Sequence, residues 1–331
     1  MRRTIGFLLI AIGSFALVLG LSMPVYAYPN LALLERGGIS HSIAEGRGLT
    51  VFDPESAVDP EVPAERHNVD VVANRTVKGL TDAPEAKVDG DVAVWEVGMV
   101  IMDRKRNKPI SVTEEKLCVN RHTSRAVDPC SSDYVKDPGR SDEHKTFNGP
   151  HTGQVYKFPF GTERKNYSYF DSTLRRAPMI RYLKEEQIHG VTVYKFEQVI
   201  PRTRIEDREV PGRLLGQPDE DSVVAGRYYE NHRVIWVEPE TGIIVKGTEE
   251  IRQTLENPTT GNSIVLLAGT IKLSDKTVRA NAKRAGDGAS KLRLLTVTTP
   301  VSAGIAGVVI ALIGVWLTRR RWEPEHAFID D

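Results

Sequence analysis

The sequence predicts a mainly β (α+β) protein in which an antiparallel β domain is flanked by an N-terminal and a C-terminal transmembrane helix. Two observations carry this prediction. Uncharged apolar stretches stand near both ends of the chain, and the segment between them consists of short apolar or alternating runs separated by Gly, Pro, Asn and Asp. Such runs are typical of strands joined by turns. The 44 basic and 44 acidic side chains balance, so the charge indicates no nucleic-acid partner.

The N-terminal apolar stretch, residues 5–27, is long enough to cross a membrane. A helix needs about 20 apolar residues to span a hydrocarbon core of roughly 30 Å. A cleavable signal peptide is the alternative, because Met1-Arg2-Arg3 is a basic start and Val25-Tyr26-Ala27 is a small-x-small cleavage site. The apolar run is longer than the ~7–15 residues usual in a signal peptide, which favours an uncleaved anchor.

Residues 297–318 form a second stretch long enough to cross a membrane. Arg2 and Arg3 precede the first stretch, and Arg319–Arg321 follow the second. Basic residues beside a membrane-spanning segment stay in the cytoplasm. We therefore expect a two-pass protein of the cell membrane with both termini cytoplasmic. The expected order is a cytoplasmic segment 1–4, a helix 5–27, an extracytoplasmic domain 28–296, a helix 297–318 and a cytoplasmic tail 319–331.

Two further expectations concern the packing of these helices and the segment before the second one. Small residues are spaced by four in both apolar stretches, at Ala16 and Gly20 and at Ala303, Gly307 and Ala311. That spacing allows two membrane helices to pack closely, although Gly and Ala are common in membrane spans in any case. Before the second stretch, residues 275–285 are expected to form a short helix that Ser274 caps and that Gly286-Asp287-Gly288 breaks.

One turn in the predicted β domain has residues that specify its geometry. In Pro239-Glu240-Thr241-Gly242, Pro fixes φ near the start of the turn and Gly accepts a positive φ at its end. The runs on either side, 233–238 and 243–250, are therefore expected to pair as a hairpin.

A loose internal repeat indicates how the strands are grouped. Residues 91–100 resemble residues 190–199, and residues 116–127 resemble residues 234–245. Two β repeats in one curved sheet would produce this similarity, and a chance match is the alternative. The polar residues 134–150 are expected to link the two halves.

The search for chemistry yields a disulfide and no catalytic site. Cys118 and Cys130 both lie in the exported segment, where an oxidising compartment favours a disulfide, with two separate buried thiols as the alternative. A metal site is disfavoured because no third ligand stands at a zinc-like spacing. Nucleophile, nucleotide-binding and metalloprotease motifs are absent from the sequence. We therefore predict a protein that is not an enzyme, with no catalytic residues, metal or cofactor.

Aromatic side chains gather between residues 156 and 171. They would either pack as a structural plug on the sheet or line the mouth of a groove for an apolar or amphiphilic ligand. The runs 91–100 and 190–199 carry apolar residues on both faces, which also favours a groove. The candidate groove residues are Tyr156, Phe158, Phe160, Tyr167, Tyr169, Phe170, Tyr194, Phe196 and Trp236.

The aromatic segment, residues 190–197 and residues 236–247 resemble the actinobacterial family of PorA-like membrane proteins. The order of helix, β-rich domain, helix and basic tail is similar as well, over nearly the whole chain. This resemblance implies a cell-envelope protein without catalytic residues. One family member associated with polar growth is linked to export of trehalose-mycolate lipids alongside a large lipid transporter. A porin in the strict sense would need a closed barrel of amphipathic strands, which two apolar helices do not supply.

Together these observations lead us to expect an envelope protein whose exported β domain binds a membrane lipid or glycolipid, or assists transport of mycolate-type lipids. A lipid transporter is a candidate partner. The first alternative is a structural scaffold that docks a transporter or an envelope complex, and the second is a porin-like activity. Lipid binding predicts an apolar cavity in the sheet, whereas a scaffold predicts a filled core and an exposed apolar patch.

Overall fold

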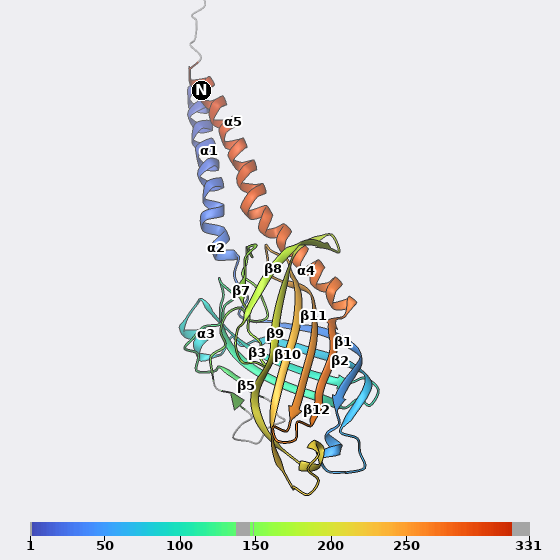
Figure 1. Cartoon of the computed structure of the whole chain (residues 1–331). Coiled ribbons are helices and arrows are strands. Elements are labelled where there is room, and N and C mark those ends of the chain that lie inside the picture. The colour runs from blue at the N-terminus through green and yellow to red at the C-terminus, as the bar shows by residue number, and fades with distance from the viewer. Residues whose placement is uncertain (1, 137–145, 148, 320–331) are drawn as a thin grey trace, which may run out of the picture. The chain divides into compact units, whose positions relative to one another are not determined.

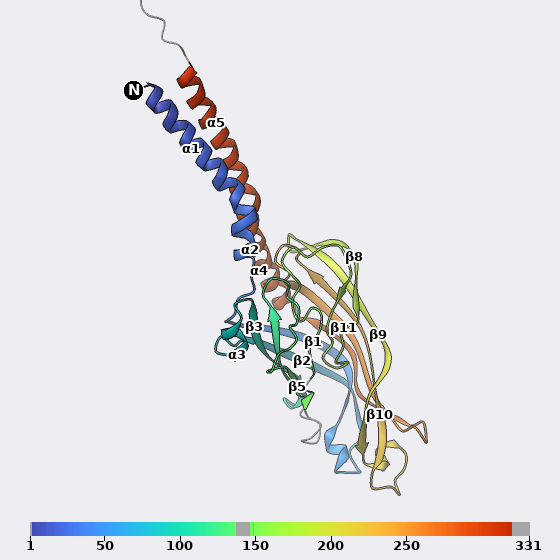
Figure 2. The same cartoon turned by 90° about the vertical axis from the view of Figure 1, so that its left-hand side faces the viewer.

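The computed structural model describes residues 2–136, 146–147 and 149–319 of the 331-residue chain. The chain divides into two units, which Figure 1 and Figure 2 show from two sides. A helical unit combines residues 1–32 with residues 289–331, and a β domain spans residues 33–288.

Two long apolar helices, α1 and α5, make up most of the helical unit. By length and composition, the stretches Arg2–Tyr26 and Asp275–Arg319 could each cross a membrane, in agreement with the two predicted spans. The helical segments at the chain ends are α1 (Arg2–Ser22), a π turn (Met23–Ala27), α2 (Tyr28–Leu31), α4 (Asp275–Arg293), a π turn (Leu294–Thr298) and α5 (Thr299–Arg319).

Glycines spaced by seven residues bring α1 and α5 together. Gly6, Gly13 and Gly20 are buried on α1, as are Gly307 and Gly314 on α5. A Cβ atom on Gly13 would lie 2.6 Å from the Gly307 carbonyl oxygen, and one on Gly6 would lie 2.9 Å from that of Gly314. The two helices are therefore antiparallel. Among the small residues predicted to pack, the contact includes Gly20, Ala303, Gly307 and Ala311, whereas Ala16 is only half-buried.

The predicted break before the second membrane helix is wrong. Ser274 caps the helix as expected, since its Oγ accepts a hydrogen bond from the Thr277 amide at 3.2 Å. The helix then continues through Gly286 and Gly288 without interruption. A Cβ atom on Gly288 would lie 2.8 Å from Thr241 Cγ2. This glycine thus allows α4 to approach the sheet closely, and the neighbouring helical turns keep its backbone regular.

The β domain is built on one antiparallel sheet that curls on itself, as Figure 2 shows. This confirms the predicted fold class. The strands are β1 (Ile39–Phe52), β2 (Glu65–Gly79), β3 (Val92–Asp103), β4 (Pro109–Asn120), β5 (Tyr134–Lys136), β6 (Thr146–Phe147), β7 (Tyr167–Ser168), β8 (Met179–Ile188), β9 (Val191–Val210), β10 (Val223–Val237), β11 (Ile244–Glu256) and β12 (Ser263–Leu273). Short helical segments follow β1, β2 and β9, at Pro54–Ala57, Pro84–Val88 (α3) and Gly212–Leu215.

The strand order reveals two meanders side by side. Within the described residues the sheet runs β6-β5-β4-β3-β2-β1-β12-β11-β10-β9-β8-β7. Each strand therefore pairs with its sequence neighbour, except that β6 and β7 lie at opposite edges and β1 pairs with β12. The first meander comprises β1 to β6 and the second β7 to β12. This arrangement agrees with two β repeats in one curved sheet.

The repeated segments also share a turn. At the ends of β4 and β10, the amides of Ser124 and Gly242 donate hydrogen bonds of 2.9 Å to the carbonyl oxygens of Asn120 and Glu238, respectively. Ser124 and Gly242 have positive φ values of 56° and 71°. In each turn the side chain of the first residue, Asn120 or Glu238, accepts two backbone amides. The predicted β10–β11 hairpin at this turn is confirmed.

Two predictions about the first meander have different outcomes. A disulfide joins Cys118 on β4 to Cys130, which confirms the expected pair. Closing such a loop stabilises by roughly 3 kcal/mol in the chain-entropy model. Residues 134–150 are not a simple linker, because β5 and β6 extend the sheet beyond β4. Residues 137–145 and 148 of that segment lie outside the described residues.

Two helices, α4 and the short α3, cover parts of the outer face of the sheet. Val193 on β9 packs with Val278 and Ala282 of α4. On the other meander, Val94 of β3 packs with Ala86 of α3. These contacts explain why residues 91–100 and 190–199 carry apolar side chains on both faces of their strands. At these places the outer face is covered by a helix.

Candidate ligand-binding cavity

The inner side of the curved sheet lines a cavity of about 640 Å³. Its walls come from strands of both meanders and from residues 169–175, which precede β8. Sites for small molecules commonly enclose about 300–1,000 Å³. The cavity is therefore large enough for a ligand and lies wholly within the β domain.

Aliphatic side chains form much of the cavity wall. They project from alternate positions of β3, β10, β11 and β12, because successive side chains of a strand point to opposite faces. Among them are Met99, Ile101, Ile235, Ile251, Leu267 and Ile271. A wall of this kind favours the hydrocarbon part of a ligand.

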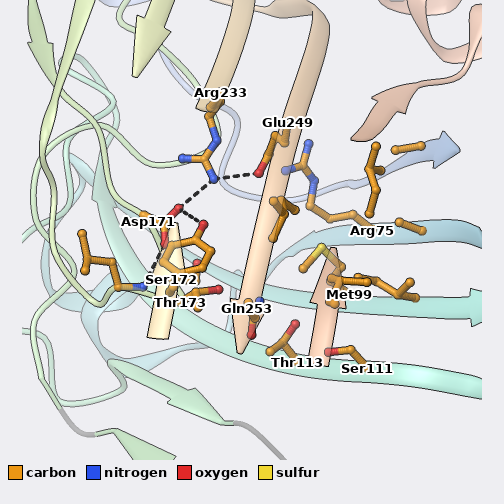
Figure 3. A pocket seen from close by; sticks show the side chains of 18 of the residues that line it. Arg75, Met99, Ser111, Thr113, Asp171, Ser172, Thr173, Arg233, Glu249 and Gln253 are labelled. Atoms are coloured by element: carbon orange, nitrogen blue, oxygen red, sulfur yellow. Dashed lines mark hydrogen bonds and ion pairs between the residues drawn. The ribbon is translucent and has the colours of Figure 1, made fainter. Parts of the chain in front are cut away.

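A buried ionic network crosses the cavity at Arg233 of β10. Its Nη2 atom lies 2.9 Å from Asp171 Oδ2 and 3.1 Å from Glu249 Oε2, as Figure 3 shows. Its Nη1 atom donates to Gln198 Oε1 at 2.7 Å. The hydroxyl of Tyr229 donates to the same Asp171 oxygen at 2.9 Å. One guanidinium thus binds two carboxylates, the buried Asp171 and the half-buried Glu249, and offsets one of their two negative charges.

The network fixes the charge states of its members. Burial opposes ionisation of Glu249, but the charge of Arg233 and the hydrogen bonds from Arg233 and Asn231 outweigh burial and lower the pKa of Glu249. Burial would likewise lower the pKa of Arg233, yet Glu249 and Asp171 raise the pKa well above its usual range. Both groups are therefore charged at neutral pH.

Arg75 of β2 is a second guanidinium in the cavity. Its Nε atom donates to Ser42 Oγ at 3.3 Å, and its central carbon lies 5.1 Å from the ring centroid of Tyr156. Figure 3 shows its side chain extending toward Glu249. Within the described part of the chain, Arg75 makes no ion pair, and Ser42 is its hydrogen-bond acceptor.

A further charged group lies on β9 and β10. Glu206 accepts from Arg227 Nη1 at 2.9 Å and from Arg208 Nε at 2.6 Å. Arg227 Nη2 also donates to Gln253 Oε1 at 2.5 Å. Both arginines and Glu206 line the cavity, so its lining combines aliphatic surface with more than one charged group.

A buried histidine connects to the cavity through Tyr156. His151 Nδ1 lies 2.5 Å from Asp133 Oδ1, and His151 Nε2 lies 3.3 Å from Glu115 Oε2. The Tyr156 hydroxyl donates to the same Glu115 oxygen at 2.7 Å. Burial opposes the charged imidazolium, but the two carboxylates outweigh burial and raise the pKa of His151 to about 9. The histidine is therefore protonated at neutral pH.

Three of the nine aromatic residues predicted for the groove line this cavity: Tyr156, Tyr169 and Phe170. Phe158, Tyr167 and Phe196 pack against one another instead, with ring centroids 5.0–5.9 Å apart. These rings form a packed core, as the plug interpretation expected. The role of the nine residues in ligand binding stays a prediction.

The remaining three aromatics lie elsewhere. Tyr194 packs beside the same aromatic core, and Phe160 packs on the core of the first meander. Trp236 faces α4 on the outer side. Arg75, Arg233 and the two carboxylates were not predicted from the sequence. A signal existed for Arg233, because period-two alternation places it on the same face as Ile235 and Val237.

The outer face of the sheet, where no helix covers it, carries polar side chains. Exposed examples on four strands are Asn74, Lys78, His232, Glu250, Arg252 and Lys272. A transmembrane barrel has the opposite arrangement, with an apolar band outside and polar side chains inside. The strands of this domain are therefore suited to water on the outside and to an apolar ligand on the inside.

The family model and the relatives that match this chain carry the same description, porin PorA. Residues 5–316 match the model of the family described as porin PorA. A protein named porin PorA from Corynebacterium amycolatum is 29% identical over 76% of this chain and 78% of its own length. Another porin PorA, from Corynebacterium resistens, is 25% identical over 99% of both chains.

Proposed function

The chain belongs to the porin PorA family of membrane proteins, and from that premise we propose that its β domain binds an acyl-chain lipid of the cell envelope. The cavity of about 640 Å³ inside the curved sheet is the observation that carries the proposal. It combines an aliphatic wall with buried charged groups, which matches the two parts of an amphiphile. We propose that it acts without enzymatic chemistry, as a carrier or an accessory in lipid transport.

The rest of the molecule supports this role. The two apolar helices provide anchors in the bilayer from which lipids leave, and their flanking arginines favour an extracytoplasmic β domain. A glycolipid or other membrane lipid would be the ligand. A membrane lipid transporter would be the partner that delivers or accepts it.

A porin-like activity is the second candidate, and the name of the relatives favours it. The charged outer face of the sheet argues against strands that contact lipid. Conductance of the purified protein in a planar bilayer separates the two, since a pore predicts ion current and a lipid-binding domain does not. A scaffold that docks a transporter predicts neither current nor bound lipid.

The experiment is native mass spectrometry of the full-length protein purified in mild detergent. We expect co-purified lipid in the wild type and strongly reduced lipid in Gly247→Leu. Gly247 lines the cavity, and a Cβ atom there would meet Ile235 and Leu273 only at 3.7–3.8 Å. The larger side chain should therefore fill the cavity without a backbone clash.

Gly98→Leu is the matched control. Gly98 lies on β3 next to Met99, which faces the cavity, and nothing lies within 4 Å of a Cβ atom at Gly98. Its side chain would point to the outer face, so bound lipid should be retained. A folded wild-type protein that carries no lipid and accepts none would overturn the proposal.

A further inference from the structure

We propose that the cavity selects an anionic amphiphile, whose acidic head group binds Arg75 while its chain lies along the aliphatic wall. This inference rests on the proposed lipid binding and adds the charge of the ligand. It follows from the balance of charges in the cavity and from the environment of one guanidinium.

The cavity lining carries more positive than negative charge. Among the described residues, five arginines line it (Arg75, Arg175, Arg208, Arg227 and Arg233) together with three carboxylates, Asp171, Glu206 and Glu249. Each carboxylate is already bound by an arginine: Asp171 and Glu249 by Arg233, and Glu206 by Arg208 and Arg227. The lining therefore attracts an additional anion.

Arg75 is positioned to bind that anion. Its Nε atom donates to Ser42 and its face lies over the Tyr156 ring, so the guanidinium is held in place at two points. Neither terminal nitrogen has an acceptor among the residues that the structure describes. A charge in a partly apolar cavity is costly without such an acceptor. A carboxylate or phosphate can accept two parallel hydrogen bonds from a guanidinium.

Two neighbouring features fit an acid with a chain. Ala73 precedes Arg75 on β2, and Met99 on β3 pairs with Arg75 across the sheet. Both side chains line the cavity and offer hydrocarbon surface for the chain. The Thr113 hydroxyl also lines the cavity, and its oxygen is buried without a hydrogen-bond partner in the described structure. It provides a further donor for a polar ligand. Carboxylate and phosphate share this chemistry, so a fatty acid and a phospholipid are both possible sources.

The test compares ligands that differ only in charge. Full-length protein in detergent is delipidated and titrated with oleate and with oleyl alcohol, which have the same chain. We expect oleate to bind more tightly by at least about tenfold, because a hydrogen bond to a charged group is roughly twice as strong as a neutral one. Dioleoyl phosphatidic acid and dioleoylglycerol form the matching pair for a phosphate head group.

The variants assign the preference to Arg75. Arg75→Met should reduce the oleate-to-alcohol ratio to about one, and Arg75→Lys should keep part of it because it keeps the charge. Arg252→Met is the control, since Arg252 is exposed on the outer face, and its ratio should equal that of the wild type. Circular dichroism verifies that each variant is folded. The wild-type comparison does not depend on any variant.

Each outcome has a distinct meaning. A preference for both acids, or for phosphatidic acid alone, supports the inference and identifies the source of the anion. Equal binding of acid and neutral ligand in both pairs overturns the inference and leaves lipid binding in place. Binding of none of the four ligands overturns the proposed function itself. A preference that persists unchanged in folded Arg75→Met overturns the role of Arg75.

Discussion

Arg233 illustrates why the charged groups of the cavity depend on one another. Its guanidinium is buried and binds the buried Asp171 and the half-buried Glu249. Removing one member of a buried ion pair leaves an uncompensated charge, which typically costs about 3–5 kcal/mol. Each buried charge in the network is therefore held by the others. Arg75 makes no ion pair, but its positive charge also lowers the pKa of Glu249.

His151 makes stability depend on pH. Its pKa is raised from 6.5 to about 9, because Asp133 and Glu115 outweigh the opposing effect of burial. The stability it contributes is present in full below about pH 6.5 and is lost as the pH rises through about 9. Lys157, whose pKa burial lowers from 10.5 to about 7, acts in the opposite direction over the same interval. We therefore expect the thermal unfolding midpoint of the detergent-purified wild type to fall relative to that of His151→Gln, in which Lys157 is unchanged. The loss should be at most about 3 kcal/mol.

His151→Gln should lack the contribution of the histidine, because the amide cannot titrate. The variant is expected to unfold at a lower temperature than the wild type near pH 6 and to differ less from it near pH 10. An equal pH dependence in wild type and His151→Gln would show that the histidine does not titrate in this interval.

At single positions, the sequence predicted interactions that depend on local spacing or on compartment. The Cys118–Cys130 disulfide and the positive φ of Gly242 are of this kind. It did not predict the ion pair of Arg233 with Asp171, because that residue comes from a segment far away in sequence. Glu249 lies opposite Arg233 in the predicted β10–β11 hairpin, so the register of that hairpin was the available signal for this pair. An alternating pattern identifies two faces of a strand, but the curvature of the sheet decides which face encloses a cavity.

At the scale of elements, a glycine can either break a helix or allow the helix to pack closely on a partner. The sequence could not distinguish these two roles. Gly286 and Gly288 suggested a break in the helix, yet α4 continues through them and packs closely on the sheet. Gly6, Gly13 and Gly20 have a spacing of seven, which follows two helical turns and keeps one face toward α5. In both cases a partner element determines the role of the missing side chain.

The glycine contact between α1 and α5 leads to a direct test. Cysteines at Gly20→Cys and Ala303→Cys should cross-link, because a Cβ atom at position 20 would lie 3.4 Å from the Ala303 Cβ, close to the separation of about 3.5–4.5 Å found in disulfides. Adding Gly13→Leu should strongly reduce cross-linking, since its Cβ would meet the Gly307 oxygen at 2.6 Å. Ser14→Leu, at an exposed position, should leave it unchanged. Equal cross-linking in both variants would contradict close packing of the glycines.

At the scale of the whole molecule, the two meanders account for the cavity. β1 pairs with β12, so both meanders contribute strands to one continuous curved surface. The sequence predicted the strands, the hairpin and the repeat, because these follow from alternation and turn residues. It could not predict that β6 and β7 stand at opposite edges, since edge positions depend on pairings between distant strands. The cavity results from the curvature of this continuous sheet and from residues 169–175.

The orientation of the chain in the membrane is the last prediction, and it rests on the ends of the two helices. α1 and α5 are antiparallel, so residues 2 and 319 lie at the same end of the pair. Arginines stand beside both positions, and such residues remain in the cytoplasm.

Both native cysteines are bonded to each other, so an introduced cysteine can be labelled without background. In intact cells, a membrane-impermeant maleimide should label His232→Cys, exposed on the β domain, and should label Asp331→Cys only after permeabilisation. The reverse pattern would place the β domain in the cytoplasm and remove the basis for a role in the outer envelope.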